Sequence, residues 1–189
     1  MKKNLLTAVL MTVATTILLG IIYPLVVTGL AQLMFHDKAN GQLISKNGEL
    51  VGSRIIGQPF VSDKYFHSRP SAAGNGYDAS NSAASNLGPT NQKLIDRVKA
   101  DTATAQAGNP NTPVPIDLVT TSASGLDPDI SPAAAFFQIP RIARVRNLPA
   151  DRVRVLVESH LERRTWGFLG EPHVNVLDLN LALDREPVF

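Results

Sequence analysis

Cysteine is absent from this chain of 189 residues. Its absence excludes a disulfide framework, a thiolate zinc site and a lipid-modified cysteine. An excess of charge of one sign is also lacking, because the net charge is only +2 at pH 7. Nucleic-acid-binding domains carry a strong basic field on one face. We therefore expect no nucleic-acid partner.

The motifs of self-sufficient catalysis are missing as well. The phosphate-binding pattern G-x-x-x-x-G-K-[ST] does not occur, and Gly74-Asn75-Gly76 lacks the lysine and hydroxyl that would follow it. The phosphorylation motif of P-type ATPases, Asp-Lys-Thr-Gly-Thr, is also absent. Ser122-Ala123-Ser124-Gly125 lacks the first glycine of the hydrolase pattern G-x-S-x-G. The four histidines lack metal-site spacing. We expect no enzyme activity in the chain by itself, no metal site and no tightly bound cofactor.

Charge is lacking from Leu5 to Phe35, where the chain is almost wholly apolar. As a helix this segment would rise about 46 Å, more than the roughly 30 Å of a bilayer core. We predict a transmembrane anchor over residues 1–35, in contact with lipid. Pro24 is expected to bend the helix. Gly20 and Gly29 offer small surfaces on which a partner helix can pack closely.

A cleaved signal peptide is the competing interpretation of this segment. Lys2 and Lys3 would be its basic region, and Gly29-Leu30-Ala31 resembles a cleavage site. The apolar run is too long, however, because the hydrophobic part of a signal peptide has roughly 7–15 residues. The two lysines also predict the orientation. By the positive-inside rule, the N-terminus is cytoplasmic and the rest of the chain lies outside.

Residues 36–189 are predicted to form one soluble α+β domain. Its expected elements, in chain order, are a strand-like run at 50–57 after an Asn47-Gly48 turn, a helix from Pro89 to a Gly108 cap, a buried strand at 116–121, a helix capped by Ser131 and opened by Pro132, and a helix starting near Pro149. Pro140 is expected to kink the helix that contains it. The pattern at 176–183 fits a strand or a helix, and both stay open.

The stretch from Arg69 to Asn86 is almost entirely small and polar. It cannot supply a core stripe, and its glycines permit tight turns. One interpretation is a surface loop. The other is a loop that orders against a partner, with Tyr77 and Asp78 as its specific contacts.

Three segments carry a resemblance when taken together and in order. They are Gly76-Tyr77-Asp78 with Ser85 to Thr90 (SNLGPT), Asp117 to Pro128 (DLVTTSASGLDP) with Ile130 to Ala135 (ISPAAA), and Gly170-Glu171-Pro172 with Val174 to Leu177 (VNVL). Behind one N-terminal membrane helix, this ordered set closely resembles the C subunit of the bacterial Kdp potassium-transporting P-type ATPase. The resemblance covers essentially the whole chain.

The resemblance implies a membrane complex in the bacterial inner membrane. The implied partners are a potassium-channel-like subunit, a P-type ATPase catalytic subunit and a small single-helix subunit. The family's C subunit is described as needed for assembly and as raising the ATP affinity of the catalytic subunit. The resemblance also implies a possible nucleotide contact at Ser122, Ser124, Gly125 and Gln138. Viewed structurally, the first three lie in a turn, and Gln138 can simply bind a backbone group.

Two functions follow from this sequence. The first is a non-catalytic accessory subunit whose domain stabilises the pump from outside the cell membrane. The alternative is a regulatory subunit with a cytoplasmic domain that contacts ATP directly.

The length of the apolar run leads to a testable prediction. We expect the mature protein to retain residues 1–35, because the run exceeds the hydrophobic part of a signal peptide. Mass spectrometry of the purified protein measures this directly. An N-terminus at Gln32 would show cleavage after Ala31 and would overturn the anchor.

Overall fold

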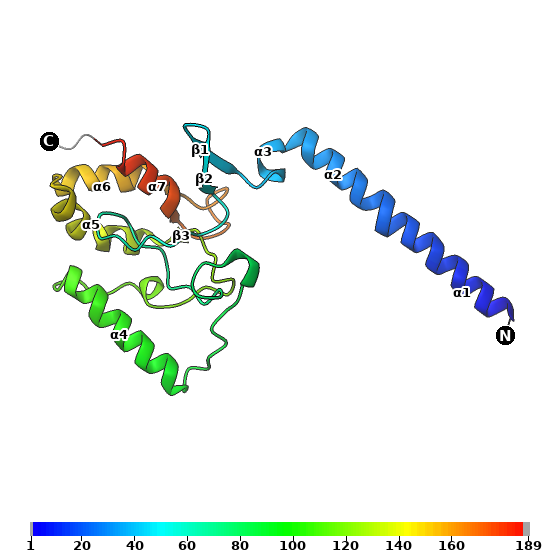
Figure 1. Ribbon diagram of the computed structural model, residues 1–189, viewed down its shortest axis with the longest axis horizontal. Helices are drawn as coiled ribbons and strands as arrows, with labels where there is room; N and C mark the ends of the chain where they lie inside the picture. Colours follow the sequence, from blue (N-terminus) through cyan, green and yellow to red (C-terminus); the bar gives the residue numbers. More distant parts are fainter. Residues whose placement is uncertain (1, 187–189) are drawn as a thin grey trace. The chain divides into compact units, whose positions relative to one another are not determined.

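The computed structural model describes residues 2–186 and divides into two compact units, which we call the N-terminal unit (Met1–Leu50) and the C-terminal unit (Val51–Phe189). Figure 1 shows the order of helices and strands along the chain. An α+β fold behind one N-terminal apolar helix was predicted, and the structure confirms it. The predicted boundary between a membrane anchor (1–35) and a soluble domain (36–189) stays a prediction.

The N-terminal unit is dominated by one long helix, made of α1 (Lys2–Thr15), a π-helical segment (Thr16–Ile22) and α2 (Tyr23–Met34). The π-helical segment ends beside Pro24, and the Tyr23 amide donates to the carbonyl of Leu18, five residues back. Proline has no N–H and its ring clashes with the carbonyl four residues earlier. Widening the preceding turns accommodates that ring, so the helix continues past Pro24.

Apolar surface covers this helix on all sides. Residues Lys2–Met34 have a mean hydropathy of 2.4 over the most apolar window, and none of that window is buried within the chain. The threonine hydroxyls are satisfied internally: Thr7, Thr12 and Thr15 donate to carbonyls four residues back at 2.8–3.0 Å. By length and composition, the helix is a candidate for a membrane span.

A short helix and a hairpin follow. These are α3 (His36–Ala39), β1 (Leu43–Lys46) and β2 (Glu49–Ser53). Asn47 and Gly48 join the two strands at φ values of 56° and 84°. Both residue types tolerate this left-handed conformation, which a two-residue hairpin turn requires.

The C-terminal unit is built on a small antiparallel sheet with three helices around its core. The strand order is β3 (Asp129–Ile130), β5 (His173–Asn175) and β4 (Leu161–Glu162). In register, Asp129 pairs with Asn175, and Val174 lies between Ile130 and Leu161. The helices are α5 (Pro132–Arg146), α6 (Ala150–Ser159) and α7 (Val176–Leu183). The largest fully buried apolar side chains of this core are Phe66, Ile130, Ile142, Val153, Val157, Val174, Val176, Leu179 and Leu183.

The start of α5 follows the prediction. Ser131 is the N-cap, its Oγ accepts from the Ala134 amide at 3.1 Å, and Pro132 occupies the first turn. The helix runs on through the exposed Pro140 and ends at Asn147, which is left-handed with φ 54°. The helix predicted near Pro149 is α6.

Residues 176–183, for which the sequence left a strand and a helix open, form a helix that follows a short strand. A strand ends at Asn175, whose side chain accepts from the Asp178 amide at 3.1 Å and so caps α7. Val176, Leu179 and Leu183 then lie on the buried face of that helix. The spacing of these three apolar residues fits a helical period, so the helical alternative holds for 176–183.

The predicted buried strand at 116–121 is wrong. Residues Ile116–Leu118 form a short 3₁₀ helix, another (Ala79–Asn81) lies in the preceding loop, and the Ile116 side chain is 74% exposed. Pro115 precedes the turn, and the amides of Leu118 and Val119 donate to the carbonyls of Pro115 and Ile116, both at 3.1 Å, so these groups bond within the turn and not in a ladder. A short apolar run does not by itself distinguish a strand from a turn.

The helix predicted from Pro89 is α4 (Gln92–Gly108), green in Figure 1, and its cap is Asn91. Its apolar stripe of Leu94, Ile95 and Val98 is only half-buried. Asn109, just after the helix, donates to the Phe137 carbonyl of α5 at 3.0 Å.

Two buried amides hold the extended segment at Phe66 and His67. Asn180 of α7 accepts from the Phe66 amide at 2.8 Å and donates to its carbonyl at 3.0 Å. Gln138 of α5 does the same for His67, at 2.8 and 3.1 Å. Successive peptide groups of an extended chain point to opposite sides, so each helix binds one of them. These two side chains replace the neighbouring strands that the segment lacks.

This arrangement predicts a large effect from a change that keeps side-chain volume. Asn180→Leu should lower the free energy of unfolding by about 2–4 kcal/mol, because it leaves the buried N–H and C=O of Phe66 without partners. Chemical denaturation of the full chain in mild detergent, followed by circular dichroism, measures the change. Asn111→Leu, on an exposed loop, is the matched control and should shift stability by less than about 0.5 kcal/mol. Equal effects of the two substitutions would contradict the role of Asn180.

Candidate functional site

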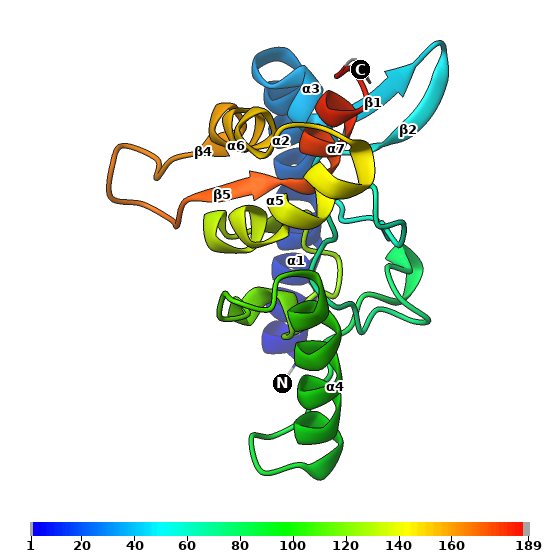
Figure 2. The ribbon, with the colours of Figure 1, turned by 90° about the vertical axis from the view of Figure 1, so that its left-hand side faces the viewer.

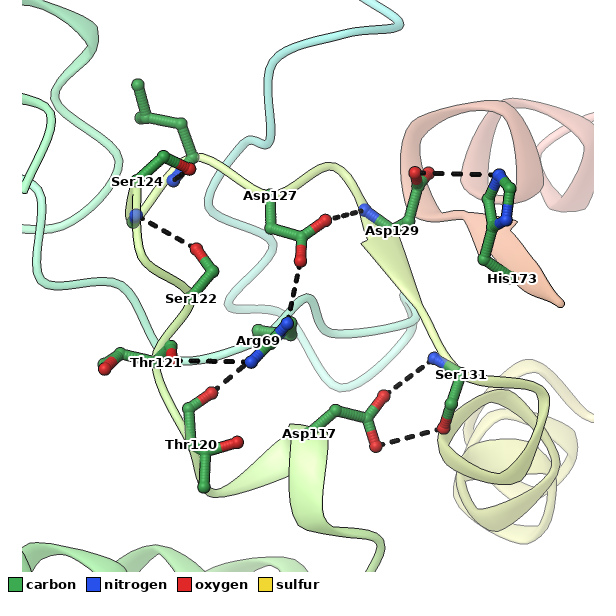
Figure 3. Close-up of polar contacts among 12 residues, drawn as sticks. Arg69, Asp117, Thr120, Thr121, Ser122, Ser124, Asp127, Asp129, Ser131 and His173 are labelled. Atoms are coloured by element: carbon green, nitrogen blue, oxygen red, sulfur yellow. Dashed lines mark hydrogen bonds and ion pairs between the residues drawn. The ribbon is translucent and has the colours of Figure 1, made fainter. Parts of the chain in front are cut away.

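Arg69 lies at the centre of a set of polar contacts with the second of the three segments, Asp117 to Pro128 (Figure 3). The guanidinium of Arg69 binds a carboxylate oxygen of Asp127 at 2.8 Å. It also donates to the carbonyls of Thr120 and Thr121, both at 3.4 Å. One side chain thereby joins the start of the small, polar loop 69–86 to the segment before α5. Both charges are largely shielded from solvent, so removing either partner leaves an uncompensated charge.

A chain of polar contacts continues from Asp127 into the sheet. Its other carboxylate oxygen accepts from the Asp129 amide at 3.1 Å. Asp129 accepts from the Asn175 side chain at 3.0 Å, and the Val176 amide donates to the Pro128 carbonyl at 3.0 Å. The second and third segments are therefore joined by side-chain bonds as well as by the β3–β5 ladder.

Asp117 connects the 3₁₀ turn to the start of α5. One carboxylate oxygen accepts from the Ser131 amide at 2.7 Å, and the other accepts from its hydroxyl at 3.0 Å. Figure 3 shows the carboxylate facing Ser131 squarely. Ser131 is thus held from both sides, since its Oγ also caps α5.

Gly125 fits a space that no other residue can occupy. Its φ is +68°, and a Cβ built there would lie 2.7 Å from both the Ala73 nitrogen and the Ala83 oxygen. Its carbonyl accepts from the Ser71 hydroxyl at 2.6 Å. The loop 69–86 thus packs its backbone directly on Gly125.

Ser122 and Ser124 both stabilise their own turn. The Ser122 hydroxyl accepts from the Gly125 amide at 3.0 Å, and the Ser124 hydroxyl accepts from the Leu126 amide at 3.1 Å. The Ser124 carbonyl accepts from the Ala83 amide and the Ser82 hydroxyl, at 3.0 and 2.9 Å. The amides that would have to face a phosphate are engaged by these hydroxyls.

Tyr77 and Asp78 fold the loop itself. The Tyr77 hydroxyl donates to the Arg69 carbonyl, its amide donates to Ser71 at 2.8 Å, and its ring lies against Gly57. Burial raises the pKa of Tyr77, so the phenol stays protonated. Asp78 accepts from the amide and hydroxyl of Ser80, at 2.9 and 2.6 Å. These bonds hold the pKa of Asp78 below its ordinary value.

Gln138 lies on α5 and does not bond to the Ser122–Gly125 turn among residues 2–186. Besides His67, its side chain accepts from Arg141 at 2.7 Å. A cavity of about 480 Å³ borders it, with a lining that includes His67, Asp101 of α4 and Arg144 of α5. Burial, and then the charge of Arg141, lower the pKa of His67, which favours the neutral imidazole.

His173 on β5 faces two carboxylates. Its Nε2 lies 3.5 Å from Glu162 and 3.8 Å from Asp129. The bond to the Glu171 carbonyl and these charges raise the pKa of His173, while burial raises the pKa of Asp129. No group of metal-binding side chains among residues 2–186 is arranged to hold a metal ion.

Gly20 and Gly29 lie in the N-terminal helix. A Cβ on Gly29 would meet nothing within 4 Å, and one on Gly20 would meet only Thr16, at 3.8 Å. Neither glycine is required by contacts within the described chain.

Sequence reasoning missed Arg69 and Asn180 entirely. Both depend on pairing over long sequence separation, of Arg69 with Asp127 and of Asn180 with Phe66. The polar Asn180 within an otherwise apolar helical face was the available signal, because a buried amide requires a partner.

Comparison with known proteins identifies the family of the chain. Residues 5–185 match the family model described as the c chain of the K⁺-transporting ATPase, KdpC. The chain belongs to the KdpC family. It is 65% identical over 184 residues to the potassium-transporting ATPase KdpC subunit of Koribacter versatilis, covering 97% of this chain and 95% of that protein. The corresponding subunits of Acidobacterium capsulatum and Rhodopseudomonas palustris are 57% and 54% identical, each covering 97% of this chain and 98% of the relative. The family membership predicted from the three segments is confirmed.

Two glycines with similar backbone angles provide a test of this KdpC site. Gly125→Ala should lower the free energy of unfolding by more than about 3 kcal/mol, because its methyl group would overlap backbone atoms and force the loop 69–86 apart. Gly167→Ala, at φ +83° with open space around it, should cost only about 1–2 kcal/mol of backbone strain. Denaturant titration of both purified variants compares them. Similar losses of stability in the two variants would show that glycine is needed at position 125 only for its positive φ angle and not for close packing.

Proposed function

We propose that this chain is a non-catalytic accessory subunit of an ATP-driven potassium uptake pump. Its anchor lies in the bacterial inner membrane, its N-terminus is cytoplasmic and its C-terminal unit is on the outer side. In this role it stabilises the assembled pump and raises the ATP affinity of the catalytic subunit. The relatives named as potassium-transporting ATPase subunits support the assignment to the pump.

One observation carries the accessory role. Around Arg69, the polar groups bind one another: the ion pair with Asp127, the Asp117–Ser131 contacts and the capped turn at Ser122. A catalytic centre needs a nucleophile, acid or base directed at open space for a substrate. These groups instead join loops and strands, which is what a rigid docking body requires.

The proposed partners are a potassium-channel-like subunit, a catalytic P-type ATPase subunit and a small single-helix subunit. The N-terminal helix has no buried surface in the described chain, so lipid and neighbouring helices would cover it. Gly20 and Gly29 are the proposed points of close helix contact. Tyr77 and Asp78 are proposed interface residues because they hold the exposed turns on either side of them.

An effect on ATP affinity from outside the membrane would be a coupling between distant sites. Such coupling requires that the subunit bind one conformation of the pump more tightly than another, and it is reciprocal. No bound nucleotide on this chain is then needed.

Direct nucleotide contact is the second candidate, and the cavity beside Gln138 favours it. Its volume of about 480 Å³ lies within the usual range for small-molecule pockets, and Arg141 and Arg144 contribute to its lining. This function needs the C-terminal unit in the cytoplasm, where ATP is. Ser122, Ser124 and Gly125 would have to exchange their internal bonds for a ligand.

The side of the membrane distinguishes the two functions. We expect protease added to intact spheroplasts to degrade the chain from Asp37 onward, because Lys2 and Lys3 hold the N-terminus in the cytoplasm. Immunoblotting of the full-length protein measures the loss, with a cytoplasmic protein as the control for lysis. Protection until the membrane is lysed would instead favour the nucleotide-binding subunit.

Co-purification tests the proposed role in assembly. Gly29→Leu should weaken co-purification with the other pump subunits, since the side chain finds no obstacle within its own helix and can clash only with a neighbour. Ala8→Leu, also exposed on the helix, is the matched control. Unchanged co-purification of the Gly29 variant would remove this glycine from the proposed interface.

A further inference from the structure

A hairpin of the C-terminal unit presents aromatic side chains to solvent. Residues 163–170, which we call the finger, join β4 to β5 and project from the helices (Figure 2). Trp166 is 81% exposed, Phe168 is 67% exposed and Leu169 is 46% exposed. Nothing in the Arg69 site or in the core uses them.

The finger is an ordered structure. Thr165 and Leu169 exchange two backbone bonds, at 2.9 and 3.0 Å, and Arg164 pairs with Glu171 at 2.6 Å across its base. Trp166 adopts φ +53°, followed by Gly167 at +83°. A bulky residue in the left-handed region is uncommon and strained. Such strain persists where the surrounding structure fixes it, here the paired Thr165 and Leu169 on either side of the turn.

We propose that the finger inserts Trp166 and Phe168 into the interfacial region of the lipid bilayer to which the chain is anchored. This inference rests on the proposed membrane anchoring. Tryptophan is enriched at membrane interfaces, because its ring is apolar while its N–H remains hydrated. Arg163 is exposed at the base of the finger and complements anionic lipid headgroups.

The size and tether of the finger favour lipid over a protein partner. Its two aromatic rings leave about 300 Å² to bury, as judged from the usual area of such side chains. A stable protein interface needs about 800 Å² from each partner. Residues 35–50, between the helix and the C-terminal unit, span at most about 55 Å even when fully extended. At the high effective concentration of a short tether, a small apolar contact is sufficient.

Trp166 is the only tryptophan in the chain, so its fluorescence reports on the finger alone. The full chain would be reconstituted into phosphatidylcholine–phosphatidylglycerol vesicles with either normal or brominated acyl chains. We expect emission in brominated vesicles to fall about twofold and quenching by aqueous acrylamide to be weak, because the ring lies at the interface.

Three variants sharpen this test. Phe168→Ser and Arg163→Glu should each reduce quenching by brominated lipid. Val155→Ser, which removes a similarly exposed apolar side chain from α6, should leave it unchanged. Circular dichroism checks that each variant is folded.

Two results would overturn the proposal. In the first, Trp166 is quenched by acrylamide and not by brominated lipid. In the second, protection of Trp166 arises only when the other pump subunits are reconstituted with the chain, which would place the finger on a protein. Failure of the anchoring itself is distinct, because the chain would then be lost from vesicles in an alkaline wash.

Discussion

The C-terminal unit depends on how one segment, residues 63–67, is held by side chains of two helices. From residue 63 to residue 67 every backbone carbonyl accepts from a side chain. Arg141 binds those of Asp63 and Tyr65, Arg146 binds that of Lys64, Asn180 binds that of Phe66, and Gln138 binds that of His67. Buried peptide groups must be paired, and no strand runs beside this segment among the described residues. The side chains of α5 and α7 take the place of strands, and they fix Phe66 at the centre of the core.

This constraint also positions the Arg69 site. Gln138 fixes the backbone of His67, and Arg69 follows only two residues later. The position of the Arg69 backbone, from which the guanidinium reaches Asp127, is therefore fixed as well. Asp127, its partner, is fixed in turn by the Asp129 amide at the start of β3. Because several half-buried polar groups share partners, loss of one is expected to weaken the others, as is usual in such networks. The polar loop 69–86 is therefore ordered by the domain itself.

Sequence reasoning succeeded where the signal was local. Ser131 followed by Pro132 specified the start of α5, Asn47-Gly48 specified a turn, and an uncharged run of bilayer length specified the apolar helix. It failed at Ile116, where apolar character suggested burial, because the chain forms a 3₁₀ turn there and leaves the Ile116 side chain exposed. It also missed β1, β3, β4 and β5 as elements, since strands of two to four residues carry too little pattern to detect.

All four residues that the resemblance implied as nucleotide contacts have a structural role within the chain. Ser122 and Ser124 cap amides of their turn, Gly125 admits the backbone of residues 73 and 83, and Gln138 binds a peptide group. A family motif can therefore consist of residues that the fold requires and that bind no ligand. A ligand at Gln138 would have to displace bonds to His67 that help to hold the core, at a cost of about 1–3 kcal/mol for each buried group left unpaired. The accessory role requires no such exchange, and it leaves the cavity beside Gln138 and the exposed finger free for contacts outside the chain.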